Sequence, residues 1–147
     1  MKNKSSISWR TILAFGWPVL LALGIFAYIQ TEGKGSAGQR LYALHCTNCH
    51  GEQGAGLRGL YPPLAGADYL LEGGAEIACL IRYGYQDSLL VNGKWYSQAM
   101  PGNKLLQDQE ITALVNYIRN EWGNEAETIP FQEIKSALDS CKPESKN

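Results

Sequence analysis

The sequence predicts an all-α, loop-rich domain that follows one N-terminal transmembrane helix. Three observations support this fold class. An uncharged apolar stretch comes first, several later segments place apolar residues at helical spacing, and no region alternates as a strand-rich domain would. Stretches with many glycines and prolines separate the helices. A domain of this size with so little regular structure usually needs a cross-link or a large cofactor in its core.

The N-terminal segment Thr11–Thr31 contains 21 residues without a formal charge. As an α-helix it would be about 32 Å long, which matches a bilayer core of about 30 Å. Lys2, Lys4 and Arg10 precede it, which predicts a cytoplasmic N-terminus and an exported domain. We therefore interpret residues 1–31 as a membrane anchor. A cleaved signal peptide is the alternative, and both interpretations place the domain in an oxidising compartment.

Charge is distributed unevenly along the chain. All 14 acidic residues lie after residue 31, where they are accompanied by ten of the 13 Lys and Arg residues, so this part carries a net charge of −4. The chain has no basic run or stripe, and we expect no nucleic-acid partner.

The elements after the anchor follow in order. Residues 32–37 form a small polar linker, within which Ser36 suits the N-cap of a helix that runs toward Cys46. We expect Leu41 and Leu44, together with Tyr42, on the inward face of this helix. Residues 51–66 are glycine-rich and predict a loop.

Three further helices are expected. The first covers residues 75–85, and it is followed by a loop over 86–102 in which Asn92-Gly93 signals a tight hairpin. The clearest helix covers 105–123, with an apolar stripe of Ile111, Leu114, Val115 and Ile118. The last begins with Pro130 at its first position, within a C-terminal extension over 124–147.

The stretch "HCTNCHG" contains Cys46, Cys49 and His50, which suit three kinds of site. A redox dithiol is expected after a strand, and none is predicted here. A zinc site needs four ligands, and the remaining thiols, Cys79 and Cys141, do not form a second pair. The spacing C-x-x-C-H matches covalent haem attachment in full. Both thiols would bond the porphyrin from one side, and the imidazole would lie under the iron. The motif thus favours haem.

An electron-carrying haem needs a sixth ligand, usually Met or His. His45 lies on the attachment side, and Met1 begins the anchor. By elimination, Met100 is the candidate, because its loop position before Pro101 lets its side chain reach across a pocket. Filling of the core is the alternative role for this methionine.

With these residues, the sequence resembles the class I c-type cytochromes over about residues 36–123. The match includes the motif "CTNCHG", the pair Met100-Pro101, and the positions Gly38, Tyr42, Pro62, Leu64, Gly66, Leu114 and Tyr117. The segments "PPLAG" and "VNGKWYSQAMPG" look most like small bacterial cytochromes that serve periplasmic dehydrogenases or terminal oxidases.

The resemblance implies a class I cytochrome c fold over 38–123, with loop-rich helices around one covalent haem c. Cys46 and Cys49 would attach the haem, and His50 and Met100 would bind its iron. The carbonyl of Pro62, or of the adjacent Pro63, would accept a hydrogen bond from the free ring nitrogen of the histidine.

Packing roles also follow from the resemblance. Leu64 would lie on the haem face, and Tyr42 would pack against Leu114 and Tyr117 where Gly38 lets two helices cross. Trp95 and Tyr96 would line the pocket or bond a haem propionate, and Arg82 would pair with a propionate, with ordinary core and surface roles as the alternatives.

Cys79, Cys141 and the tail after Gly123 depart from the family pattern. Leftover thiols in an oxidising compartment often pair. A disulfide would tie the tail helix to the helix over 75–85, and two free thiols are the alternative.

These inferences predict an electron carrier and not an enzyme: a membrane-tethered monohaem cytochrome that cycles between Fe(III) and Fe(II). Its partners would be redox proteins, with no small-molecule substrate. It would lie in a bacterial inner membrane with the haem domain in the periplasm. One alternative is a cytochrome subunit of a dehydrogenase or terminal oxidase. Another is a haem sensor or peroxidase in which Met100 leaves the iron.

Overall fold

The structure is a computed structural model that describes residues 18, 20, 21, 23–25 and 35–141. The chain divides into two compact units, Met1–Lys34 and Gly35–Asn147. Most of the predicted anchor lies outside the described residues, and the few that are described there are helical. Within the described residues, no helix is long and apolar enough to cross a membrane.

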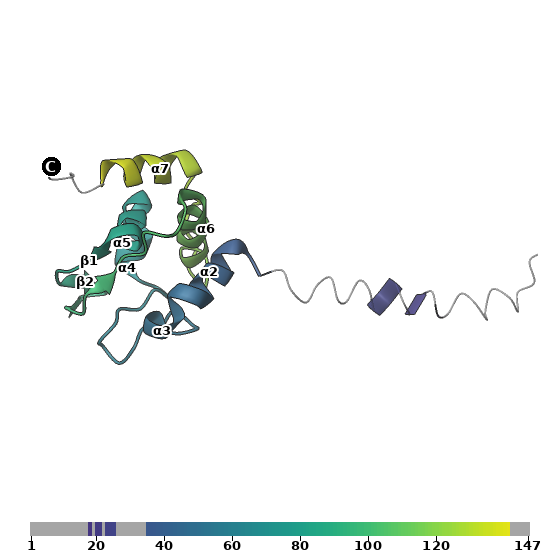
Figure 1. Cartoon of the computed structure of the whole chain (residues 1–147). Coiled ribbons are helices and arrows are strands. Elements are labelled where there is room, and N and C mark those ends of the chain that lie inside the picture. The colour runs from purple at the N-terminus through teal and green to yellow at the C-terminus, as the bar shows by residue number, and fades with distance from the viewer. Residues whose placement is uncertain (1–17, 19, 22, 26–34, 142–147) are drawn as a thin grey trace, which may run out of the picture. The chain divides into compact units, whose positions relative to one another are not determined.

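The second unit is rich in helices and contains two small antiparallel sheets, β1 with β4 and β2 with β3 (Figure 1). Its elements in chain order are α2 (Ala37–His45), α3 (Thr47–His50), α4 (Asp68–Glu72), the 3-10 helix η1 (Gly74–Glu76), α5 (Ile77–Tyr83), β1 (Gly84–Tyr85), β2 (Leu89–Val91), β3 (Lys94–Tyr96), β4 (Met100–Pro101), α6 (Asp108–Ile118) and α7 (Phe131–Ser140).

Helix α2 crosses α6 at very close range. It begins at the predicted N-cap, where the Ser36 hydroxyl accepts a hydrogen bond from the Gln39 amide at 3.1 Å. A Cβ atom on Gly38 would collide with the carbonyl oxygen of Ala113 and the Cβ of Tyr117 in α6. Only glycine therefore allows the two backbones to approach this closely.

The prediction that Leu44 faces inward was wrong, because its side chain is 73% exposed whereas that of Tyr42 is 3% exposed. The reason is that α2 packs chiefly on α6 and buries one narrow stripe, which contains Gly38 and Tyr42. Gly38 and Tyr42 are four residues apart and therefore share one face of the helix. Leu44 follows Tyr42 by two residues, which places its side chain on the opposite face.

Helix α6 forms the centre of the core, and all four residues of its predicted stripe are buried. Helix α7 packs on α5, α6 and η1 through Ile134, Ala137 and Leu138 (Figure 1). Pro130 is the N-cap of α7 and not its first residue, because its ψ of 150° is extended. A disulfide between Cys79 in α5 and Cys141 ties the end of α7 to the rest of the unit.

The sequence did not predict helix α4, which has only five residues. So short a helix shows no clear periodicity and depends on tertiary contacts. The buried Arg119 guanidinium provides them, because its Nη1 donates to the carbonyl oxygens of Leu70 and Leu71 at 2.6 and 3.1 Å. The predicted hairpin does form between β2 and β3, with both Asn92 and Gly93 at positive φ in the turn.

Asn124 joins two segments that enclose the core. Its side chain is buried, and its Oδ1 accepts a hydrogen bond from the Gly66 amide at 2.8 Å. Its Nδ2 donates to the carbonyl oxygens of Leu64 at 3.0 Å and Ile118 at 2.8 Å. The loop that contains Pro62, Leu64 and Gly66 is thus fixed to the end of α6.

We expect Asn124→Ala to lower the free energy of unfolding by about 2 kcal/mol or more, because it leaves buried backbone groups without partners. Denaturant unfolding measures this change. Asn120→Ala is the matched control, because this exposed asparagine also bonds backbone groups yet should cost only about 0.5 kcal/mol. Equal losses in the two variants would contradict the role given to Asn124.

Candidate functional site

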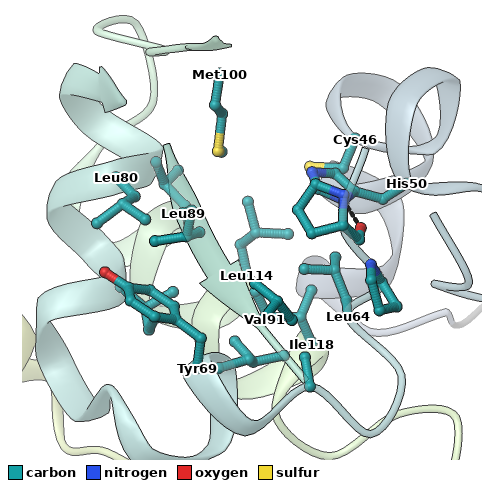
Figure 2. Close-up of a pocket in the computed structure, with 16 residues that line it drawn as sticks. Cys46, His50, Leu64, Tyr69, Leu80, Leu89, Val91, Met100, Leu114 and Ile118 are labelled. Carbon is teal, nitrogen blue, oxygen red and sulfur yellow. Dashed lines mark hydrogen bonds between the residues drawn. The ribbon is translucent and has the colours of Figure 1, made fainter. Parts of the chain in front are cut away.

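The core of the second unit contains an apolar cavity with about 620 Å³ of empty space, part of it open to solvent. A second cavity of about 490 Å³ adjoins it. Five residues line both cavities: His50, Pro62, Leu80, Leu89 and Met100. Figure 2 shows Met100 pointing into this space from one side, with His50 and Cys46 on another. The two cavities are therefore adjoining parts of one site.

His50 is the last residue of α3, and its imidazole is held in one orientation. Its Nδ1 donates a hydrogen bond to the carbonyl oxygen of Pro62 at 3.0 Å (Figure 2). Burial lowers the pKa of His50, and the bond to Pro62 opposes this with a smaller effect. Burial thus favours the neutral ring, and since Nδ1 carries the proton that is donated to Pro62, Nε2 is the nitrogen left to bind a metal. The neighbouring Pro63 does not make this bond.

The two cysteines of the motif both lie in the wall of the site. Cys46, between α2 and α3, lines the first cavity, and Cys49, within α3, lines the second. Both thiols are free and partly buried. Burial, with a smaller effect of Cys49, raises the pKa of the Cys46 thiol to about 11. Redox dithiols need the opposite shift, because the thiolate is the reactive form.

A zinc site needs a cluster of ligands. Across the part of the chain that the structure describes, no three His, Cys, Asp or Glu residues group closely enough to hold a metal ion. The exposed His45 precedes Cys46 and does not line either cavity.

Met100 lies in β4, which pairs with β1 so that Met100 is opposite Tyr85 and Pro101 is opposite Gly84. Its side chain contacts the edge of the apolar core and lines both cavities. The methionine thus reaches the site from an element separate from the one that carries His50. This placement suits a second axial ligand better than plain filling of the core.

Leu64 lines the first cavity, which agrees with its implied place on the haem face, and Leu114, which the resemblance placed against Tyr42, lines this cavity too. Tyr42 and Tyr117 do not line either cavity but pack with Trp122 in a cluster. The ring centroids of Tyr42 and Trp122 lie 4.8 Å apart, and those of Tyr42 and Tyr117 lie 5.8 Å apart.

The aromatic cluster also holds the loop after the motif. The Tyr42 hydroxyl donates to the carbonyl oxygen of Gly51 at 2.6 Å, and Trp122 Nε1 donates to that of Glu52 at 3.0 Å. The tyrosine and the tryptophan therefore hold the backbone that directly follows His50. No sequence pattern indicated this role for Trp122, which lies beyond the end of α6 and outside its periodicity.

Two suggested pocket residues are placed elsewhere. Trp95 is 66% exposed, whereas its neighbour Tyr96 lines the second cavity, because successive residues of a strand face opposite sides. Arg82 forms an ion pair with Asp108 at 2.6 Å. The suggestion that Trp95 lines the pocket was wrong, and the pairing of Arg82 with a haem propionate stays a prediction.

The residues present fit a large, flat, apolar cofactor that is bound covalently. Almost every other side chain that lines the first cavity is apolar, and the set includes Leu70, Ile77, Leu80, Ile81, Leu89, Val91 and Ile118. The two cysteines lie in the wall, and an imidazole and a thioether enter from separate elements. These are the groups that attach a c-type haem and bind its iron.

Comparisons with known proteins agree with this chemistry. The profile of the Cytochrome c family matches residues 35–122. The chain is 37% identical over 127 residues to a cytochrome c-552 of Thermus thermophilus, which covers 84% of this chain and 78% of that protein. It is 32% identical over 124 residues to the cytochrome c subunit of the quinone alcohol dehydrogenase of Gluconobacter oxydans, covering 81% of this chain and 25% of that subunit. The chain therefore belongs to the cytochrome c family of electron carriers, whose cofactor is covalently bound haem c.

Proposed function

We propose that the chain is a membrane-tethered cytochrome with one haem c that passes single electrons between redox proteins of a respiratory chain. The observation that carries the proposal is that His50 and Met100 line both of two adjoining cavities, with Cys46 in the wall of the first and Cys49 in the wall of the second. The haem supplies an iron that alternates between Fe(III) and Fe(II).

The residues of the chain have distinct roles in this function. Cys46 and Cys49 would hold the haem covalently through their sulfur atoms, and His50 and Met100 would bind its iron. The hydrogen bond to Pro62 fixes the imidazole, and such a bond also increases its basicity. A thioether ligand and the apolar lining both favour the ferrous state and so raise the reduction potential.

The tether belongs to the proposal because of residues 11–31, which are apolar and uncharged and follow three basic residues. The haem domain would then face the periplasm of a bacterium. A tether limits the search for partners to the neighbourhood of the membrane and raises their effective concentration.

A second candidate function is that of a cytochrome subunit fixed in a dehydrogenase or terminal oxidase complex. One observation favours it: the relative from Gluconobacter oxydans is the cytochrome c subunit of an alcohol dehydrogenase. Purification of the native protein from membranes decides between the two. A stoichiometric partner supports the subunit, and a monodisperse cytochrome without a partner supports the carrier.

Replacement of the sixth ligand tests the site. We expect Met100→Ala to abolish the far-red absorption band that the bond between the thioether sulfur and ferric iron produces. The same change should lower the reduction potential by on the order of 0.1 V, within the range of roughly 0.8 V that axial ligands span. Leu89→Ala is the control, because Leu89 lines the same two cavities without a ligand atom, and this variant should keep the band.

An unchanged iron coordination in Met100→Ala would contradict the assignment of the ligand. Carbon monoxide added to the reduced wild-type protein at neutral pH gives a further check. Ready binding would favour a sensor or peroxidase in which the methionine leaves the iron.

Cell fractionation tests the tether. The full chain, produced with haem maturation in a bacterial host, should remain in the membrane fraction after a carbonate wash. A control chain in which a cleavable signal peptide replaces residues 1–31 should be released as a soluble periplasmic protein. A soluble full-length product whose mature N-terminus, by mass spectrometry, lies near residue 24 would instead support a signal peptide.

A further inference from the structure

The C-terminal extension lies beyond the residues that match the family, 35–122, yet it packs against the wall of the haem site. Ile134 and Leu138 of α7 are buried against the unit, with exposed fractions of 0% and 3%. The disulfide joins Cys141, directly after α7, to Cys79 in the middle of α5. Helix α5 is therefore held from outside by an element that the family pattern does not include.

Helix α5 leads directly into β1, the strand that pairs with the strand of Met100. It ends at Tyr83, and β1 follows at once and pairs with β4. The amide of Asn103, just after β4, donates to the carbonyl oxygen of Ile81 in α5 at 2.8 Å. The backbone of α5 is thus linked to the strand of Met100 by the pairing of β1 with β4 and by the hydrogen bond from Asn103.

Two glycines tighten this connection. A Cβ atom on Gly84 would collide with the carbonyl oxygen of Met100, and one on Gly102 would collide with the backbone of Tyr83 and Gly84. The strands are therefore in close backbone contact. A displacement of the Met100 backbone away from the cavity would therefore disturb β1 and the end of α5.

Helix α5 depends on its neighbours for stability. It has seven residues, and isolated helices of this length are unstable in water. Its inner side, with Leu80 and Ile81, lines the haem cavity. Its outer side is held by α7 and by the disulfide. Loss of the outer support should therefore raise the fraction of molecules in which this part of the structure opens locally.

We propose that the Cys79–Cys141 disulfide and α7 form a brace that keeps Met100 in the haem site and limits its displacement by external ligands. Cys79, Cys141 and Ile134 are positioning residues in this scheme, since none of them lines either cavity. The inference rests on the proposed role of Met100 as the sixth ligand.

The test compares the haem-loaded full chain with its Cys79→Ala/Cys141→Ala double variant. Imidazole is titrated into the ferric protein, and loss of the sulfur-to-iron absorption band reports replacement of the methionine. We expect the double variant to bind imidazole about tenfold more tightly, which corresponds to about 1.4 kcal/mol. Hydrogen exchange of the Asn103 amide should become faster by a similar factor.

Two further variants separate the brace from general stability. Ile134→Ala loosens α7 but leaves the disulfide intact, and it should shift imidazole binding in the same direction by a smaller factor. Val115→Ala is the control, because this residue of α6 is fully buried but lines neither cavity. It should lower the free energy of unfolding without changing imidazole binding. All titrations use conditions in which each variant is folded, as circular dichroism verifies.

Wild-type imidazole affinity in the double variant would overturn the proposal, and so would an equal increase in Val115→Ala. Failure of the proposed function gives a different result, because the wild-type protein would then lack the sulfur-to-iron band. In that event, the exchange rate of the Asn103 amide still reports whether the brace holds the methionine strand.

Discussion

The close crossing of α2 and α6 is the constraint on which the rest of the unit depends. Gly38 lets the two backbones meet, and Tyr42 then packs one turn later against Tyr117 and Trp122. Because Cys46 directly follows α2, the crossing also fixes where the attachment motif starts. The inner face of α6 supplies Leu114 and Ile118 to the cavity. One helix contact therefore determines both where the haem is attached and what it packs against.

The predictions that succeeded rest on local sequence. The spacing of Cys46, Cys49 and His50 limits the site to three chemistries, of which the absence of a predicted strand and of a second cysteine pair favours haem. The chain contains a single methionine besides Met1. The stripe of α6 is long enough to show its period, and Asn92-Gly93 specifies its turn without help from distant residues. The resemblance supplied what these patterns do not contain, including the bond between His50 and the carbonyl of a proline.

The features that the sequence did not reveal depend on contacts between distant segments. Asn124 bonds to a loop about 60 residues away, and Arg119 caps α4 from a similar distance, so no short window of sequence shows either role. Leu44 was misplaced because apolar character alone does not indicate that α2 buries only a narrow stripe. Arg82 is paired with Asp108 in the fold, a partner that spacing along the chain does not reveal.

The hairpin of β2 and β3 separates the cavity from solvent with a single layer of backbone. Leu89 and Val91 face the cavity, and the cross-strand partners Leu90 and Trp95 are exposed on the other side. Because side chains alternate along a strand, the insertion of one residue within β2 would turn this wall inside out, whereas two residues would preserve its facing. We therefore expect insertions or deletions within β2 to preserve the cavity wall only when they change the strand by an even number of residues.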